Sequence, residues 1–279
     1  MTGRSKTLDI DALVAMVPDG ASIVSPSDAN GVPMAATRAL IRLGTRDLTL
    51  IGGPTSGLQA DLLIGAGRVS KIETAAVTLG EFGGAPRFRE AAQTGALVIR
   101  DSTCPAIHGA LQAAEKGSPF MPLRGLIGSD LLRERPDWVV IDNPYAKTEH
   151  DPIVLLPAIV PDIALIHAAQ ADSEGNVWIG ARREAMSMAR AARKVLVTVE
   201  DLVDGNLMDN PETSPGTLPA LYVDAVSRCP MGAWPLGFAD RYGPDSEHMT
   251  AYARDARTQA GFDRYLDRFV AVEPPLAAE

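Results

Sequence analysis

The chain has 279 residues, a formal net charge of −9 and a sequence pI of about 5.0. This acidic balance argues against a nucleic acid partner, because neutralising phosphates requires a basic surface. No apolar run reaches the roughly 18 residues that a membrane span needs, and no apolar stretch follows the basic start of the chain. The two cysteines, Cys104 and Cys229, lack the spacing of metal ligands. We therefore expect a cytoplasmic protein that binds no membrane, no nucleic acid and no metal.

Hydrophobic residues make up 46% of the chain but aromatic residues only 5%, so the core must be aliphatic. Runs with strand and helix patterns alternate along the chain. This alternation predicts an α/β fold with an open, mostly parallel sheet and helices on both faces. We expect one domain over residues 1–272 and a flexible, proline-containing tail over 273–279. Residues 117–157, which include six prolines, predict an irregular segment around the domain edge.

The expected elements follow one another in a regular order, and glycines at 44 and 95 are expected to end two of the helices. They are helix 8–17, strand 22–25, helix 33–43, strand 48–51, helix 58–64, strand 72–78, helix 87–94, strand 97–100, helix 107–116, strand 164–167, helix 182–193, strand 195–199, strand 223–226 and helix 247–269.

Three loops follow strands of the expected sheet and are the candidate binding segments, since open parallel sheets bind ligands at the carboxyl ends of their strands. They read PSDANGVP (26–33), LGEFGGAPRFRE (79–90) and RDSTC (100–104). The second loop is glycine-rich, with Arg87 and Arg89 nearby, and suits an anion. A plain connection between strand and helix is the alternative for each loop. The candidate substrate-binding residues are Ser27, Asp28, Asn30, Glu81, Phe82, Gly83 and Ser102.

The polar stretch IALIHAAQADSEGNVWIGA (163–181) is interpreted as a structural corner rather than a catalytic site. A strand ends at His167, and a turn follows from Asp172 to Asn176, with a glycine free to adopt positive φ. His167 has no cysteine or second histidine at ligand spacing. Glu174 is expected at an exposed turn position, without the burial that acid–base chemistry requires.

The segment GAGRVSK (65–71) resembles a dinucleotide-binding fingerprint, but a helix precedes its glycines and a strand follows them. The mechanism needs the opposite order, so a helix end and a turn are the better interpretation. Cys104 follows a strand as a possible nucleophile, although lone cysteines are more often small core residues.

Eight segments, in order and at compatible spacing, carry a resemblance that covers nearly the whole chain. They span residues 32–53, 61–72, 86–97, 117–125, 141–145, 161–179, 194–203 and 223–235. Together they resemble the alpha (A) subunits of family I CoA-transferases, of the glutaconate CoA-transferase type. The resemblance implies the open α/β sheet that this family shares with certain sugar-phosphate isomerases.

The resemblance also implies a function. These enzymes move CoA from an acyl-CoA to a carboxylic acid through a glutamate nucleophile, which forms an anhydride and then a glutamyl-CoA thioester. That glutamate belongs to the beta subunit, and its Ser-Glu-Asn-Gly context does not occur in this sequence. The chain is therefore expected to shape the acyl pocket, to be inactive without a beta partner in an α2β2 or larger assembly, and to hold no permanent cofactor, with the CoA thioester as substrate. The expected acyl group has a second carboxylate or a similar polar end. The expected partner interface is apolar and includes the PSDANG loop (26–31) and the segment 117–157.

Two departures from the family pattern leave other functions open. Pro26, Ser27 and Asp28 stand where the family has a Gly-Gly-Phe loop, and Trp234 stands where it has a histidine. Proline has no amide hydrogen to offer to a thioester oxygen. One alternative is a subunit of a CoA-thioester (ring-opening) hydrolase of steroid or other catabolism, with Asp101 as general base if the fold buries it. The other is a non-catalytic scaffold subunit.

Overall fold

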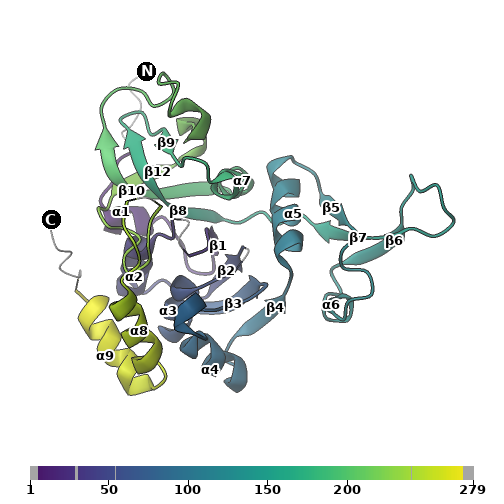
Figure 1. Cartoon of the computed structure of the whole chain (residues 1–279), viewed down its shortest axis with the longest axis horizontal. Helices are drawn as coiled ribbons and strands as arrows, with labels where there is room; N and C mark the ends of the chain where they lie inside the picture. The colour runs from purple at the N-terminus through teal and green to yellow at the C-terminus, as the bar shows by residue number, and fades with distance from the viewer. Residues whose placement is uncertain (1–5, 29–30, 54, 240, 273–279) are drawn as a thin grey trace.

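A mostly parallel sheet forms the centre of this computed structural model, which describes residues 6–28, 31–53, 55–239 and 241–272 (Figure 1). Its parallel strands lie in the order β12-β10-β8-β1-β2-β3-β4, and β9 and β11 extend it in antiparallel fashion. The strands are β1 (Ser22–Ser25), β2 (Leu48–Gly52), β3 (Val69–Thr74), β4 (Val98–Asp101), β8 (Ile163–Asp172), β9 (Val177–Trp178), β10 (Lys194–Val203), β11 (Thr217–Leu218) and β12 (Ala225–Arg228).

Both faces of this sheet are covered by helices, because successive strand residues point to opposite sides and both kinds are apolar. Ile23 and Leu165 pack in one hydrophobic cluster, whereas their neighbours Val24 and Ile166 pack in another. The first cluster includes side chains of α1 (Ile10–Val14), α2 (Met34–Leu43), α3 (Leu58–Gly65), α4 (Pro86–Thr94), α8 (Ser246–Asp255) and α9 (Gln259–Phe269). The second includes side chains of α5 (Cys104–Glu115) and α7 (Arg183–Ala191). The predicted α/β fold is confirmed.

The strand order reverses beside β1. From β1 the chain moves outward through β2, β3 and β4, and it later returns to add β8, β10 and β12 on the other side of β1. The loops that leave β1 and β8 at their carboxyl ends therefore run in opposite directions. Such a reversal opens a crevice at that edge of an open α/β sheet, and this crevice is where the fold class binds its ligands.

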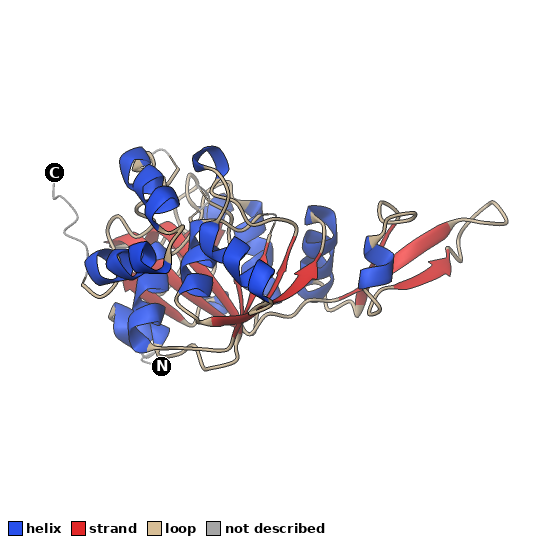
Figure 2. Ribbon diagram, turned by 90° about the horizontal axis from the view of Figure 1, so that it is seen from below, coloured by secondary structure: helices blue, strands red, loops and turns tan. Residues whose placement is uncertain are grey.

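Residues 117–157 were predicted to be irregular, and this prediction was wrong. They form an arm, in which an antiparallel sheet of order β5-β7-β6 carries a short helix. The arm extends away from the main sheet (Figure 2). The prolines suggested an irregular segment, because proline cannot donate a backbone hydrogen bond within a sheet. Three of them lie where a strand tolerates the missing N–H: one on the edge strand β5 and two at the ends of β7. The elements are β5 (Phe120–Leu123), α6 (Leu131–Glu134), β6 (Val139–Asp142) and β7 (Pro152–Pro157).

Arg135 fastens the arm to the edge of the main sheet. Its guanidinium donates to the Asp101 carbonyl oxygen at 3.0 Å and lies 2.9 Å from the carboxylates of both Glu73 and Asp137. The same group stacks 4.2 Å from the centre of the Trp138 ring, which belongs to a small hydrophobic cluster formed by the arm and Ala106 of α5. The pKa of Arg135 is raised, because the two carboxylates outweigh the cost of burial.

Several element boundaries differ from expectation. Strand β3 begins at Val69 rather than residue 72, and β8 continues to Asp172 rather than ending at His167. The long helix expected over 247–269 is two helices, because the Thr258 hydroxyl accepts from the Gly261 amide and starts α9 anew. Gly44 and Gly95 adopt φ of 84° and 70° as helix caps, as predicted. The tail 273–279 lies outside the described residues. Within the described part of the chain, helices long and apolar enough to cross a membrane are absent.

A buried carboxylate ties three helices together beneath the sheet. Asp61 of α3 accepts hydrogen bonds from the Phe88 amide of α4 and the Tyr252 hydroxyl of α8, both at 2.7 Å. Its side chain is fully buried, and burial raises its pKa to about 6 against the opposing effect of these hydrogen bonds. Asp61 therefore binds a proton more tightly in the folded state than in the unfolded chain. As the pH rises from about 4 to 6, its ionisation lowers the free energy of unfolding of the protein.

We predict that Asp61→Asn removes this part of the pH dependence. The amide keeps an acceptor for Phe88, and its NH2 group can donate to the Tyr252 hydroxyl, which donates to Asp61 in the wild type, but it cannot ionise. The free energy of unfolding of the variant, relative to wild type, should increase by about 2 kcal/mol between pH 4 and pH 7. Urea unfolding at each pH measures this difference. Asp130→Asn on the exposed surface of the arm is the control and should give a flat difference.

Candidate functional site

A cavity of about 360 Å³ opens at the carboxyl ends of β1, β2 and β3. The loops that follow these strands form most of its wall, and α8 and the segment before it close the remaining side. The cavity lies beside the reversal of strand order, on the β2 side of β1, and its volume is in the range of small-molecule sites. The lining residues are Ser27, Asp28, Thr55, Ser56, Gly57, Thr78, Leu79, Gly80, Glu81, Phe82, Leu236, Gly237, Pro244 and Met249.

Asp28 is the most perturbed ionizable group of this cavity. Its carboxylate lies against the start of α3, where the Leu58 amide donates to Oδ2 at 3.3 Å. The position of Gly57 explains the approach, since any β-carbon there would collide with the carboxylate. Burial raises the pKa of Asp28 to about 6, and the hydrogen bond from Leu58 offsets only part of this effect. Near neutral pH the group can therefore accept or release a proton.

A hollow of about 20 Å³ adjoins the cavity next to Asp28. Its polar lining includes Asp28, Ser25 at the end of β1, and Thr55 and Ser56 of the loop after β2, and apolar side chains of β1, β2 and α3 complete it. The Ser25 hydroxyl oxygen is buried and has no hydrogen-bond partner among the described residues. Leaving a buried hydroxyl unpaired costs free energy, so this oxygen is available to a polar group that enters the hollow.

The structure brings together four of the predicted substrate-binding residues: Ser27, Asp28, Glu81 and Phe82. Glu81 is exposed at the rim on the 3-10 turn η1 (Gly80–Phe82), and Phe82 is half-buried against the first hydrophobic cluster. Gly83 is outside the lining, where its carbonyl accepts from the Leu79 amide. Asn30 lies outside the described residues.

The arginines of the glycine-rich loop do not serve this cavity. Arg87 is buried on α4, where its guanidinium contacts Glu90 at 2.5 Å and Gln259 at 3.1 Å. The exposed Arg89 packs over the backbone of Gly84. The expectation that this loop suits an anion therefore finds no support in the positions of its basic side chains.

Asp101 and Ser102 lie elsewhere. Asp101 ends the edge strand β4 with an exposed side chain, so the burial required for the general-base hypothesis is missing. Ser102 lines a separate cavity of about 120 Å³, between the edge of the main sheet and the arm. Asp101 is the last residue of β4 and Ser102 follows it, but β4 is remote in the strand order from the reversal beside β1.

The loop residues after β2 were not predicted from the sequence, although the same rule would have found them. Thr55, Ser56 and Gly57 follow strand β2 directly, in the run GGPTSG. Leu236 and Met249 carry no comparable local signal, because only the three-dimensional fold brings their distant segments to the cavity.

The corner 163–181 has the predicted turn. The Asp172 carboxylate accepts from the amides of Glu174 and Asn176, both at 3.0 Å, and Gly175 has φ of 91°. Glu174 is exposed, as expected. The corner therefore closes the β8–β9 hairpin, and its polar side chains satisfy the backbone of the turn.

His167 is not at a strand end but in the middle of β8, fully buried in a polar network. Its Nδ1 lies 2.9 Å from the Thr198 hydroxyl and its Nε2 lies 2.7 Å from Glu200. Glu200 also accepts from the Tyr242 hydroxyl at 2.6 Å and from the Met231 amide at 2.7 Å. The network joins β8, β10 and the segment before α8.

The charges of this network follow from its burial. Burial lowers the pKa of His167 against the pull of Glu200, so the imidazole is neutral near pH 7. Burial would raise the pKa of Glu200, but the hydrogen bonds from His167 and Tyr242 hold it below its usual value. The partners select the tautomer, in which Nε2–H donates to Glu200 and Nδ1 accepts from Thr198.

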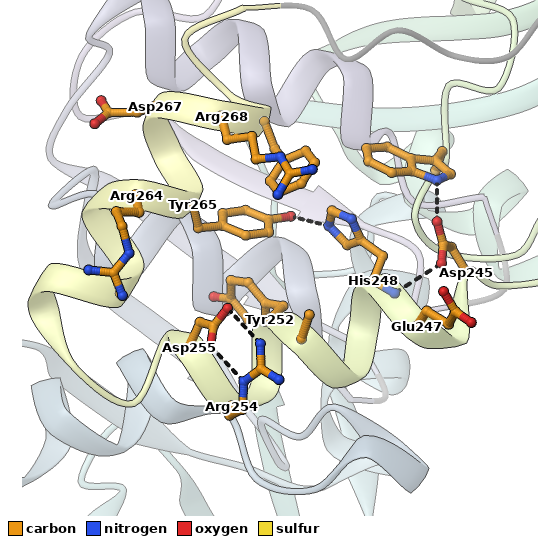
Figure 3. Close-up of a pocket in the computed structure, with 14 residues that line it drawn as sticks. Asp245, Glu247, His248, Tyr252, Arg254, Asp255, Arg264, Tyr265, Asp267 and Arg268 are labelled. Carbon is orange, nitrogen blue, oxygen red and sulfur yellow. Dashed lines mark hydrogen bonds and ion pairs between the residues drawn. The ribbon is translucent and has the colours of Figure 1, made fainter.

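A larger cavity, about 850 Å³, lies between α8 and α9 (Figure 3). His248 and Tyr265 meet in it, with Nε2 and the hydroxyl 2.8 Å apart, and burial lowers the pKa of His248 to about 4. Its charged groups include the pair Arg254 and Asp255, at 2.7 Å. None of the predicted site residues that the structure describes line it, and α8 separates it from the first cavity. Groups of three or more side chains able to hold a metal ion are absent from the described residues.

Fold and site together describe an α/β chain with a cavity of small-molecule size beside a strand-order reversal. Residues 7–228 match the family model described as coenzyme A transferase. The chain belongs to the coenzyme A transferase family, as its sequence resemblance predicts. It is 32% identical over 267 residues to the A subunit of the 3-oxoadipate CoA-transferase of Pseudomonas knackmussii, covering 93% of this chain and 91% of that one. It is also 32% identical to the A subunit of the glutaconate CoA-transferase of Acidaminococcus fermentans, covering 85% of this chain and 78% of that one.

Two further relatives are similar over almost the whole of this chain, and one of them is named for a different activity. The cholesterol ring-cleaving hydrolase IpdA subunit of Rhodococcus jostii is 29% identical over 278 residues, covering 96% of this chain and 93% of that one. An uncharacterized protein of Archaeoglobus fulgidus is 33% identical over 95% of this chain, which spans only 59% of that protein.

Two solved structures have the same fold over almost the whole chain. The glutaconate CoA-transferase of Acidaminococcus fermentans superposes with a TM-score of 0.89 at 29% identity, covering 97% of this chain and 90% of that one. The decarboxylase AibA/AibB, in a C56S variant, superposes with a TM-score of 0.82 at 30% identity, covering 95% of this chain and 100% of that one.

We predict that Glu200→Ala lowers the free energy of unfolding by about 3 kcal/mol, because one buried and two partly buried donors lose their acceptor together. The neighbouring variant Asp201→Ala is the matched control. Asp201 makes a partly exposed ion pair with Arg241, so its loss should cost less than about 1 kcal/mol. Chemical unfolding of both variants tests this, and equal effects would contradict the structural role given to the network.

Proposed function

We propose that the chain is the alpha subunit of a heteromeric CoA-transferase that moves CoA between an acyl-CoA and a carboxylic acid. The observation that carries the proposal is the cavity at the reversal of strand order, in a chain of the coenzyme A transferase family. Ser27, Asp28, Glu81 and Phe82 line the pocket for the acyl group. The beta subunit supplies the glutamate nucleophile, whose sequence context this chain lacks.

The reaction then divides between the two chains. The partner's glutamate attacks the thioester carbonyl and releases CoA thiolate, which leaves an acyl–glutamyl anhydride. The thiolate attacks the glutamyl carbonyl of this anhydride, which frees the first acid and forms a glutamyl-CoA thioester. The acceptor carboxylate reverses these steps. The role of this chain is to orient the acyl group against the partner's carboxylate, which contributes through proximity.

We predict that acyl-CoA followed by borohydride inactivates the complex and modifies the partner chain, but not this chain. The glutamyl-CoA thioester is reducible, and it forms on the partner. Mass spectrometry of both chains after treatment locates the modification, and the complex treated with borohydride without acyl-CoA is the control. A CoA adduct on any side chain of this chain would refute the assignment.

A hydrolase subunit is the second candidate, favoured by the similarity to the ring-cleaving hydrolase subunit over almost the full length of both chains. In that case water replaces the acceptor acid, and no glutamyl-CoA thioester needs to form. Incubation of the complex with an acyl-CoA in the presence and absence of an acceptor acid separates the two functions. Acceptor-dependent formation of a new CoA ester supports transfer, whereas consumption of the ester without an acceptor supports hydrolysis.

The arm supports the expectation of an apolar partner interface. Strand β6 lies at the edge of its sheet and exposes apolar side chains on both faces, with Val139 and Ile141 on one and Val140 on the other. Tyr145, in the loop that follows, is 91% exposed. Apolar side chains on an unpaired edge strand are typical of a surface that another chain covers. We assign this surface to the beta subunit.

We predict that Val139→Asp combined with Ile141→Asp weakens assembly with the beta subunit at least roughly tenfold, since two charges would enter an apolar contact. Analytical ultracentrifugation of the co-expressed chains measures the dissociation. Leu43→Asp is the control, because Leu43 is also exposed but lies at the end of α2, next to the amino ends of the strands. Undiminished assembly of the double variant would place the partner elsewhere.

A further inference from the structure

The ionizable side chains that line the cavity beside β1 have an unexpected charge for a pocket that would bind carboxylic acids. Its ionizable lining residues, within the described part of the chain, are Asp28 and Glu81, and both are acidic. The same holds in the sequence of the loops that shape it. Residues 26–32 and 52–57 contain one ionizable side chain, Asp28, and residues 75–85 contain one, Glu81. A second carboxylate on an acyl group would therefore meet like charge.

The nearest basic side chains face other parts of the molecule. Arg87 is buried on α4 and contacts Glu90 and Gln259. Arg182 lies behind the loop after β1, where it donates to the carbonyl oxygens of Ile179 and His167 and stacks over Phe238. Neither arginine lines the cavity. Among the described lining residues, therefore, no guanidinium stands opposite Asp28 to bind a carboxylate of the substrate.

The rest of the wall is apolar or carries neutral hydroxyl groups. Ser27, Thr55, Ser56 and Thr78 contribute hydroxyls, and Leu79, Phe82, Leu236, Pro244 and Met249 contribute apolar surface. The Ser25 hydroxyl, unpartnered among the described residues, lies in the hollow next to Asp28. An ionised carboxylate accepts hydrogen bonds, and a hydroxyl both donates and accepts them. A hydroxyl group on the substrate can satisfy Asp28 and Ser25 together.

We propose that this pocket selects an acyl group with a neutral, hydroxyl-bearing distal end and rejects one with a second carboxylate. The inference rests on the proposed function, since it takes the cavity beside β1 to be the acyl pocket. Asp28 acts as the specificity-determining residue. It accepts a hydrogen bond from the substrate hydroxyl and repels a carboxylate at the same position. The sequence led to the expectation of an acyl group with a second carboxylate or a similar polar end. Of these two, the present proposal retains the neutral polar end.

Three six-carbon CoA esters that differ only at the distal end provide the test. They are hexanoyl-CoA, 6-hydroxyhexanoyl-CoA and adipyl-CoA, which end in a methyl, a hydroxymethyl and a carboxylate. With the complex of both subunits and acetate as acceptor, we expect kcat/KM for 6-hydroxyhexanoyl-CoA to exceed that for adipyl-CoA at least roughly tenfold, with hexanoyl-CoA between them.

Asp28→Asn then isolates the charge. The variant keeps the shape and an acceptor oxygen but removes the repulsion, so the preference against adipyl-CoA should shrink roughly tenfold while hexanoyl-CoA turnover changes little. Ser25→Ala should reduce the advantage of the hydroxyl ester over hexanoyl-CoA without improving adipyl-CoA. Asp130→Asn, an exposed residue of the arm, is the control and should leave all three ratios unchanged.

The pH dependence gives an independent measure. Asp28 has a pKa of about 6, and the facing elements contribute Glu81 as the other ionizable lining group among the described residues. The distal carboxylate of the adipyl group, with a pKa near that of glutamate at about 4.3, stays ionised above pH 5.5. As the pH falls from 8 to 5.5, Asp28 gains a proton, and the adipyl-to-hexanoyl ratio should rise several-fold. The rise should be absent in Asp28→Asn.

The outcomes separate the two proposals. If the complex transfers CoA but uses adipyl-CoA as well as the hydroxyl ester, the substrate assignment is wrong and the transferase function stands. If no ester is turned over, the transferase function fails, and calorimetric binding of the same esters to the complex decides the substrate assignment. Equal affinity for the three esters, or a preference for adipyl-CoA, would overturn it.

Discussion

The reversal of strand order beside β1 is the constraint on which the site depends. Because the chain leaves β1 toward β2 and later returns to β8 on the other side, the loops after these strands diverge and leave a crevice between them. The loop after β1 must bridge that crevice, and it does so by hydrogen bonding across it, from the His167 amide to the Gly31 carbonyl at 2.8 Å. Asp28 is consequently held at the start of α3, where its carboxylate loses most of its hydration.

The network around His167 holds the segment that forms the opposite wall of the cavity. Register pairs His167 with Thr198, which places Glu200 two residues further along β10 on the same face. Glu200 then reaches across to Met231 and Tyr242, and so fixes the segment that continues into the cavity wall at Leu236 and Gly237. Gly232 is required where this segment passes over the imidazole, because a β-carbon there would approach the ring to 2.5 Å. The buried polar groups thus position the wall without entering the pocket.

The fold and part of the site could be predicted from the sequence, because each depends on local patterns. Alternating apolar runs indicated the strands, and the rule that loops follow strand ends led to Asp28, Glu81 and Phe82. The same rule failed for Asp101 and Ser102, because it does not say where a strand lies in the sheet. The buried role of His167 was also out of reach, since its partner Glu200 is brought close only by strand register. The arm was missed because the positions of its prolines are informative only once the edge strands are known.

The electrostatics of the chain bear on the proposed division of labour between two subunits. CoA carries phosphates, yet this chain has a net charge of −9, and the ionizable groups that line the candidate pocket, among the described residues, are acidic. Phosphates are bound by basic side chains or by converging backbone amides, and an acidic pocket wall disfavours them. An acidic acyl pocket is compatible with a CoA substrate when the nucleotide part is bound at a distance from it, on another surface or another chain. The pocket would then contact only the acyl group, and a single carboxylate such as that of Asp28 would determine which acyl groups bind.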